Sequence, residues 1–415
     1  MINKIRNQIY RLLRSTQKYT STDNVYLARG GFWLILGQVT AAATSFLLAL
    51  AFANLLPKDT YGNYQYIISL VGTLGIFNLT GMRIAVSQAT ARGLEGSFYT
   101  GFKTQLKWGF LASIVAIGGA LYYWLRGNIL LPIPLLLIAV FLPLMLASRV
   151  YIGLLAGRKL FNVQTKYGII NQVVAVSIMI AVLLLTKNLL WLVTAYLLSH
   201  TFLNYFLYLL IKHRFQPNKK EDPQTISYGF HISLMAVMSK AASYADKIIL
   251  FTVIGSSQLA VYSFAIIIPG EIQKILGHIL TLAAPKLAPK SRVEIKKTIM
   301  KKVGKLFLLT AALAILYIII APYFYKIFFP QYLESVPYSQ LFILSFISVP
   351  MGLLGVSFQA KMMKKELYLI KIAPFIKIAL LAVLIPFYGI WGAIMAIIGA
   401  EAIQSGLVLF LFRKF

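Results

Sequence analysis

Long apolar runs separated by short polar stretches are the dominant pattern of this chain. An α-helix of about 20 apolar residues spans the roughly 30 Å hydrocarbon core of a bilayer. The pattern therefore predicts an all-α, polytopic membrane protein. The twelve runs occupy most of the 415 residues and leave no room for a sizeable soluble domain. They cover residues 31–55, 64–86, 108–125, 129–148, 168–186, 189–211, 229–254, 259–283, 306–323, 338–358, 368–386 and 390–411.

The positive charges follow the same alternation. The chain has 40 Lys and Arg against 11 Asp and Glu. Thirty of the cations lie in the N-terminal tail, the even-numbered loops and the C-terminus. The odd-numbered loops hold only Lys58, Arg126, Lys187 and Lys326. Cytoplasmic loops are the ones enriched in Lys and Arg, so both termini are predicted to be cytoplasmic in a multi-pass inner-membrane protein.

The composition excludes several other classes. Without cysteine there is no disulfide, thiolate nucleophile or Cys-based metal site. No separate hydrophilic domain carries the cations, so we expect anionic membrane lipids rather than nucleic acid as their partner. Two segments have an apolar helical face opposite Lys and Arg: the N-terminal residues 1–30 and the eighth loop from Ile295 to Leu306. Both are predicted to lie on the inner leaflet.

The two halves of the chain resemble each other at an offset of 198 residues. Gly31-Phe32 aligns with Gly229-Phe230, and Tyr64 aligns with Tyr262. Six spans per half is an even number, which predicts parallel repeats around an axis along the membrane normal. The expected domains are a cytoplasmic segment 1–30, a six-helix bundle 31–211, a linker 212–227 and a second six-helix bundle 228–415.

The motifs favour transport over catalysis. Gly153 to Lys159 reads GLLAGRK, which lacks the spacing of a phosphate-binding loop. No metalloprotease, redox or nucleophile-elbow motif occurs, and the outer loops are too short for a glycan-polymerising site. The chain is therefore not expected to be an enzyme or to hold a metal or cofactor. Parallel six-helix halves suit alternating access around a site between them.

The start of each half resembles a known family. LLPKDTYGNY, from Leu55 to Tyr64, is similar to the turn after the first span of Wzx-type O-antigen and exopolysaccharide flippases. YADKIIL from Tyr244 to Leu250, followed by LAVY from Leu259 to Tyr262, is similar to that family's seventh span and following turn. The resemblance extends over the whole chain in length, span count and repeat order.

The resemblance implies a fold and a function. The fold would be two six-helix bundles that form a V-shaped central cleft. The substrate would be an undecaprenyl-diphosphate-linked oligosaccharide, moved from the cytoplasmic to the outer leaflet with ion or potential coupling. A polysaccharide polymerase complex is a further implied partner. Relatives that export drugs share the architecture, so a cation-coupled multidrug or small-molecule exporter is the alternative.

Charges inside the spans are expensive, at least about 2.5–3.5 kcal/mol at mid-bilayer, so they are expected to face a cavity or a partner. Lys240 and Lys247 lie seven residues apart on one helical face, with Asp246 beside Lys247. We expect the two lysines to line the cleft and bind the diphosphate or acidic sugars. Alternatively, Asp246 and Lys247 neutralise charges on neighbouring helices.

The eighth span carries a second group of polar residues. Glu271, Lys274 and His278 share one helical face, directly after Pro269-Gly270, which is expected to open the helix locally. Glu271 or His278 is a candidate for carrying a coupling proton, because burial raises a carboxyl pKa and His titrates near neutrality. Lys274 is either a substrate contact or the ion-pair partner of Glu271.

Three further charges complete the predicted site. Lys377 and Glu401 lie at equal depth on the last two spans, so an interhelical ion pair is expected. Arg83, near the cytoplasmic end of the second span, either binds a phosphate bidentately or reaches the lipid headgroups.

Overall fold

The computed structural model of the protein describes residues 24–281, 287 and 289–415, and every regular element in them is helical. The predicted N-terminal surface helix lies mostly outside these residues. The elements of the first half are α2 (Asn24–Leu55), α3 (Lys58–Leu74), η1 (Gly75–Asn78), α4 (Met82–Ala91), α5 (Ser97–Leu125), α6 (Pro132–Ala147), η2 (Ser148–Val150), α7 (Tyr151–Gly157), α8 (Phe161–Leu185) and α9 (Leu189–Phe215). Those of the second half are α10 (Thr225–Ile254), α11 (Ser256–Thr281), α13 (Arg292–Phe328), η3 (Pro330–Tyr332), α14 (Ser335–Phe342), η4 (Ile343–Met351), α15 (Gly352–Ala360), α16 (Lys364–Ile370) and α17 (Ala373–Arg413).

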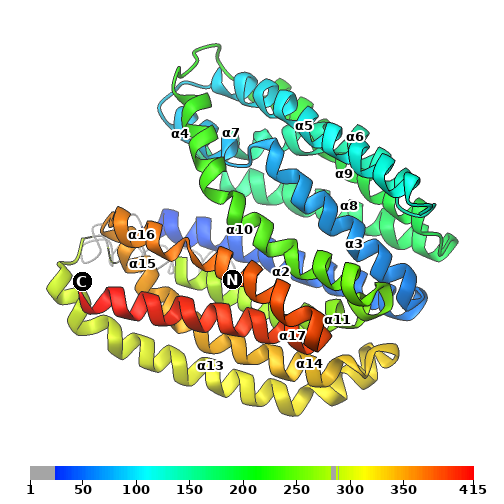
Figure 1. Cartoon of the computed structure of the whole chain (residues 1–415). Helices are drawn as coiled ribbons and strands as arrows, with labels where there is room; N and C mark the ends of the chain where they lie inside the picture. Colours follow the sequence, from blue (N-terminus) through cyan, green and yellow to red (C-terminus); the bar gives the residue numbers. More distant parts are fainter. Residues whose placement is uncertain (1–23, 282–286, 288) are drawn as a thin grey trace, which may run out of the picture.

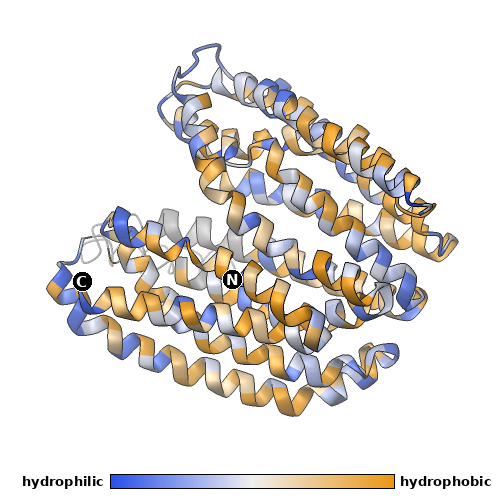
Figure 2. Cartoon of the chain, viewed as in Figure 1, coloured by the Kyte–Doolittle hydropathy of each residue, from blue (hydrophilic) through white to orange (hydrophobic). Residues whose placement is uncertain are grey.

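The all-α membrane fold is confirmed. Among the described residues, nine helical segments are long and apolar enough to cross a membrane, or ten if the pair α3–η1 and α4, bent by 49°, counts as one span. α17 has a non-helical turn at Gly389, with φ 55° and ψ −126°, between the last two predicted spans. The full count of twelve stays a prediction. Figure 2 shows apolar residues along the helices and polar residues concentrated at their two ends.

The helices form two groups, which we call the first helix group (α2–α9) and the second helix group (α11–α17) (Figure 1). The groups lie close together near the α2–α3 and α10–α11 turns and diverge toward the opposite end. α10 crosses between them.

Buried amides hold the bent helices of the first helix group in place. Pro143 lies inside α6, and its carbonyl accepts a hydrogen bond from Asn78 Nδ2 at 3.2 Å. Leu79 follows η1 with φ 47°, and Gln105 Nε2 donates to the carbonyls of Asn78 and Leu79 at 3.0 and 3.2 Å. Non-helical backbone is tolerated at membrane depth only where such groups satisfy it.

The prediction that Ile295 to Leu306 form a separate helix on the membrane surface is wrong. α13 continues without a break from Arg292 to Phe328. Ile295, Ile299 and Val303 are at most 3% exposed and pack with Phe358 and Phe412. Because the apolar face of this segment packs against other helices of the protein, the segment extends the ninth span and does not lie on the bilayer.

A network of hydrogen bonds attaches the linker to the first helix group. Arg158 binds Glu95 through two hydrogen bonds of 2.6 Å, and the Asn218 backbone amide donates to the same carboxylate at 3.1 Å. The hydrogen bonds from Arg158 lower the pKa of the Glu95 carboxyl group, which lies in a loop, below its usual value. Arg92 forms an ion pair with Asp222. The start of α10 is therefore held against the first helix group.

Candidate functional site

α10 carries most of the predicted site residues and contacts both helix groups. Near its start, Ser233 Oγ accepts a hydrogen bond from the Gly81 amide at 2.9 Å. A Cβ on Gly81 would lie 2.6 Å from the Ser233 backbone nitrogen, so only glycine at position 81 permits this close approach of α10 to the start of α4. Farther along, α10 packs against α3 and α17. α10 therefore presents different faces to the two helix groups.

One face of α10 meets a cluster of cations. Lys240 is near enough to Arg83 of α4 and Arg149 of η2 for the three positive charges to repel one another. Arg149 also interacts with Tyr196 and His200 of α9. Arg83 and Lys240 are half-buried, and Arg149 is exposed. We call Arg83, Arg149 and Lys240 the cationic cluster.

Arg83 and Lys240, two predicted substrate contacts, are therefore near each other in the structure. Arg149 joins this cluster although the sequence pattern placed it only among the cytoplasmic loop cations. Its position directly after the apolar run 129–148 was the available signal. The 3₁₀ turn of η2 keeps this arginine beside the spans.

Lys247 is separated from this cluster. Its Nζ donates to Gln65 Oε1 of α3 at 2.9 Å, and Gln65 Nε2 donates to the Tyr61 hydroxyl at 2.6 Å. Asp246 accepts a hydrogen bond from the Tyr262 hydroxyl at 2.5 Å. The continuous Lys240–Lys247 stripe predicted from the sequence is thus divided, because each side chain has a different partner.

The two halves of the chain are in close contact at the α2–α3 turn. Lys58 forms an ion pair with Glu334, and Ser256 Oγ donates to Asp59 Oδ1 at 2.9 Å. A Cβ on Gly62 would lie 1.8 Å from the Ser256 carbonyl oxygen. An aromatic cluster lies beneath these contacts: Tyr61, Phe264, Phe329 and Tyr332. We call this region the seal.

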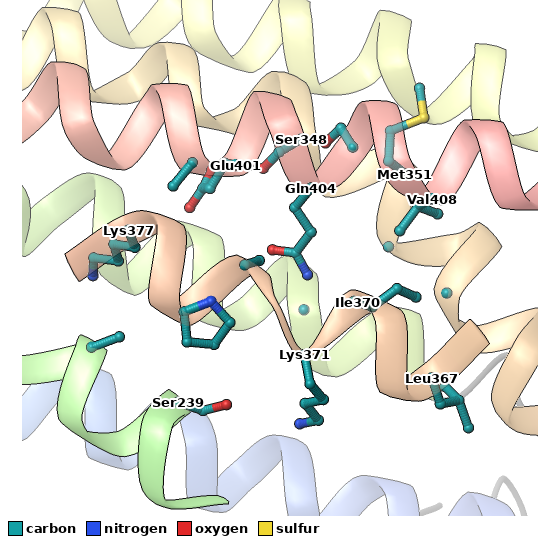
Figure 3. Close-up of a pocket in the computed structure, with 18 of the residues that line it drawn as sticks. Ser239, Ser348, Met351, Leu367, Ile370, Lys371, Lys377, Glu401, Gln404 and Val408 are labelled. Atoms are coloured by element: carbon teal, nitrogen blue, oxygen red, sulfur yellow. Dashed lines mark hydrogen bonds between the residues drawn. The ribbon is translucent and has the colours of Figure 1, made fainter. Parts of the chain in front are cut away.

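The second helix group contains a cavity of about 930 Å³ (Figure 3). Lys377 and Glu401, from the two arms of α17, both line it. The described residues contain no ion pair between them, which corrects the sequence prediction. The carboxylate of Glu401 instead accepts from Ser348 Oγ at 2.7 Å and Gln273 Nε2 at 3.3 Å, and the Lys377 amino group points away (Figure 3).

α11 differs from the prediction in one respect. The helix passes through Pro269 without opening, because its helical hydrogen bonding continues on both sides of the proline. Lys274 Nζ and Glu271 Oε1 form the alternative ion pair at 2.6 Å, and Lys274 is largely exposed. The side chain of His278 lies outside the described part. Among the described residues, no group of three or more His, Asp or Glu could hold a metal ion.

Comparisons with known proteins give a consistent fold. The chain is similar to the lipid II flippase MurJ in an inward closed conformation, with 14% identity, coverage of 93% of this chain and 87% of the other, and a TM-score of 0.68. It is also similar to multidrug resistance MATE family transporters of the MOP superfamily. The inward-facing one has 11% identity, coverage of 90% and 94%, and a TM-score of 0.62. The outward-facing one has 13% identity, coverage of 93% and 95%, and a TM-score of 0.60.

No curated protein matches the sequence. The model of one family, described as polysaccharide biosynthesis protein, matches residues 27–288. This match covers more than half of the chain and confirms the resemblance derived from the two span-and-turn motifs. The chain belongs to the polysaccharide biosynthesis protein family, within a fold shared by MOP superfamily transporters.

Proposed function

We propose that the protein flips an undecaprenyl-diphosphate-linked oligosaccharide from the cytoplasmic to the outer leaflet for surface polysaccharide synthesis. The cationic cluster carries this proposal. Three cations, Arg83 from α4, Arg149 from η2 and Lys240 from α10, lie near enough to one another to interact electrostatically. A diphosphate is a compact anion that accepts charge-assisted hydrogen bonds from lysine and bidentate ones from arginine.

The two ends of the helix groups are arranged as expected if the substrate enters from the cytoplasm. The predicted cytoplasmic end holds the linker, where the helix groups diverge (Figure 1). The seal lies at the other, predicted outer, end. In an alternating-access cycle the seal opens after the substrate has bound, while the two groups approach each other at the linker end.

An ion gradient or the membrane potential is the proposed driving force. Moving one charge across 100 mV is worth about 2.3 kcal/mol. Among the predicted coupling residues, Glu271 forms an ion pair with Lys274, whereas the hydrogen bonds that the structure describes to Asp246 and Glu401 come from uncharged donors. The proposal assigns no catalytic step to any of these residues.

The test measures flipping of a fluorescent undecaprenyl-diphosphate oligosaccharide in proteoliposomes. We expect Arg149→Gln and Lys240→Gln each to lower the initial rate at least tenfold, with normal protein levels. Lys103→Gln, an exposed cation on α5, is the matched control and should retain the wild-type rate. Wild-type rates in both cluster variants would contradict the proposed site. A deletion strain with normal polysaccharide and altered drug susceptibility would instead support the exporter.

A further inference from the structure

The cavity of the second helix group is a compartment separate from the cationic cluster. Ser239 and Ser243 of α10 line the cavity, whereas Lys240 on the same helix interacts with Arg83 and Arg149 of the first helix group. The two compartments therefore lie on different faces of one helix. The cavity's volume of about 930 Å³ is at the upper end of the roughly 300–1,000 Å³ of small-molecule sites.

The charged lining of the cavity is predominantly positive. Lys364, Lys371 and Lys377 line it together with one acid, Glu401. None of the three lysines has an ion-pair partner within 4.0 Å among the described residues. Glu401 is occupied by neutral donors on α11 and η4. An anionic group in the cavity would give the lysines the partner that the protein does not provide.

The uncharged lining has the chemistry that recognises hydroxyl groups. The side-chain amides of Gln273 and Gln404 each offer a donor and an acceptor, as does the hydroxyl of Ser239. Figure 3 shows Gln404 pointing into the space between the two arms of α17 and α10. The other end is apolar, lined by Leu367, Met351 and Val408. A sugar has the same division, with hydroxyl groups at its edges and C–H groups on its faces.

We propose that this cavity binds an acidic saccharide, the carboxylate-bearing part of the carried glycan; this inference rests on the proposed flippase function. Lys377 and Lys371 pair with the sugar carboxylate, and Gln404 and Glu401 bind neighbouring hydroxyl groups. The diphosphate occupies the cationic cluster on the other face of α10. An anionic phospholipid headgroup shares the chemistry of a charge beside hydroxyl groups, so the test separates the two sources.

The test uses the full chain in phosphatidylcholine nanodiscs and isothermal titration calorimetry. The acidic probe is a tetrasaccharide of alternating glucuronate and N-acetylglucosamine, and the neutral probe is an N-acetylglucosamine tetrasaccharide. We expect the acidic probe to bind at least tenfold more tightly. Lys377→Met and Lys371→Gln should each weaken its binding at least fivefold. Lys297→Gln, on the exposed face of α13, is the matched control and should leave binding unchanged.

Several results would overturn the proposal: equal binding of the two probes, no binding of either, or full affinity in both cavity variants. Displacement of the acidic probe by phosphatidylglycerol, without displacement by phosphatidylcholine, would assign the cavity to a phospholipid headgroup. The flipping assay is read separately. Wild-type flipping without acidic preference refutes only the saccharide site, and acidic binding without flipping refutes only the proposed function.

Discussion

The two helix groups bury polar atoms in opposite ways. In the first helix group, Asn78 and Gln105 donate to backbone carbonyls beside the internal proline of α6 and at the end of η1. In the second helix group, the half-buried polar atoms of Glu401 and Lys377 line a cavity. Neutral amides can replace missing backbone bonds in a filled interior, whereas charges require space for water or a ligand. The difference indicates a filled interior around the bend of the first helix group and a space that can admit water or a ligand in the second.

The largest expected effect is on the interior of the first helix group. Gln105→Leu would leave the carbonyls of Asn78 and Leu79 buried without their side-chain donor. The Leu79 carbonyl keeps the Met82 amide as a donor, so one buried carbonyl is left unsatisfied, and we expect the variant to lose about 1–3 kcal/mol of stability. Thermal unfolding in detergent measures this loss, with Lys103→Gln on the same helix as the control. An unchanged midpoint would show that these bonds do not hold the bend.

A smaller stability effect is expected in the cavity. Glu401→Leu removes a carboxylate hydrogen-bonded to Ser348 and Gln273, but both donors border a space that admits water. We expect a loss of at most about 1 kcal/mol in the same unfolding assay. A loss as large as that of Gln105→Leu would mean that the second helix group is as tightly built as the first, and the comparison would fail.

The smallest effect concerns a charge at the water-facing end of the first helix group. Glu95 is paired with Arg158, which lowers its pKa, so its stabilisation is present above the unfolded-state pKa and is lost as pH falls through the lowered folded-state value. Glu95→Gln should therefore cost about 0.5–1 kcal/mol from pH 8 to pH 6. The difference from the wild-type protein should begin to shrink below the usual glutamate pKa of about 4.3 and vanish only below the lowered folded-state pKa. A difference that grows in acid would have the wrong sign.

The membrane architecture could be predicted from the sequence because each apolar run is a local property. The positions of the helices follow from local hydrophobicity. The family motifs, Leu55–Tyr64 and Tyr244–Leu250, are short continuous segments. The possible ion pair of Glu271 with Lys274 likewise depends only on residues that are close in sequence. The Glu271–Lys274 pair formed because three residues separate them on one helix. Interactions between helices were predicted less well. Equal depth suggested that Lys377 meets Glu401, but rotation of the two arms of α17 decided otherwise.

The sequence by itself determined that this chain is an all-helical membrane protein of the polysaccharide biosynthesis family, because hydrophobicity along a helix and short motifs require no knowledge of distant contacts. Only the tertiary structure decided which charges meet. Arg149 joined Arg83 and Lys240 through a 3₁₀ turn, while Lys247, two turns along the same helix, bound Gln65. The physical reason is that the direction in which a charged side chain points depends on how its helix is rotated and crosses its neighbours. Helix rotation and crossing follow from packing across the entire chain.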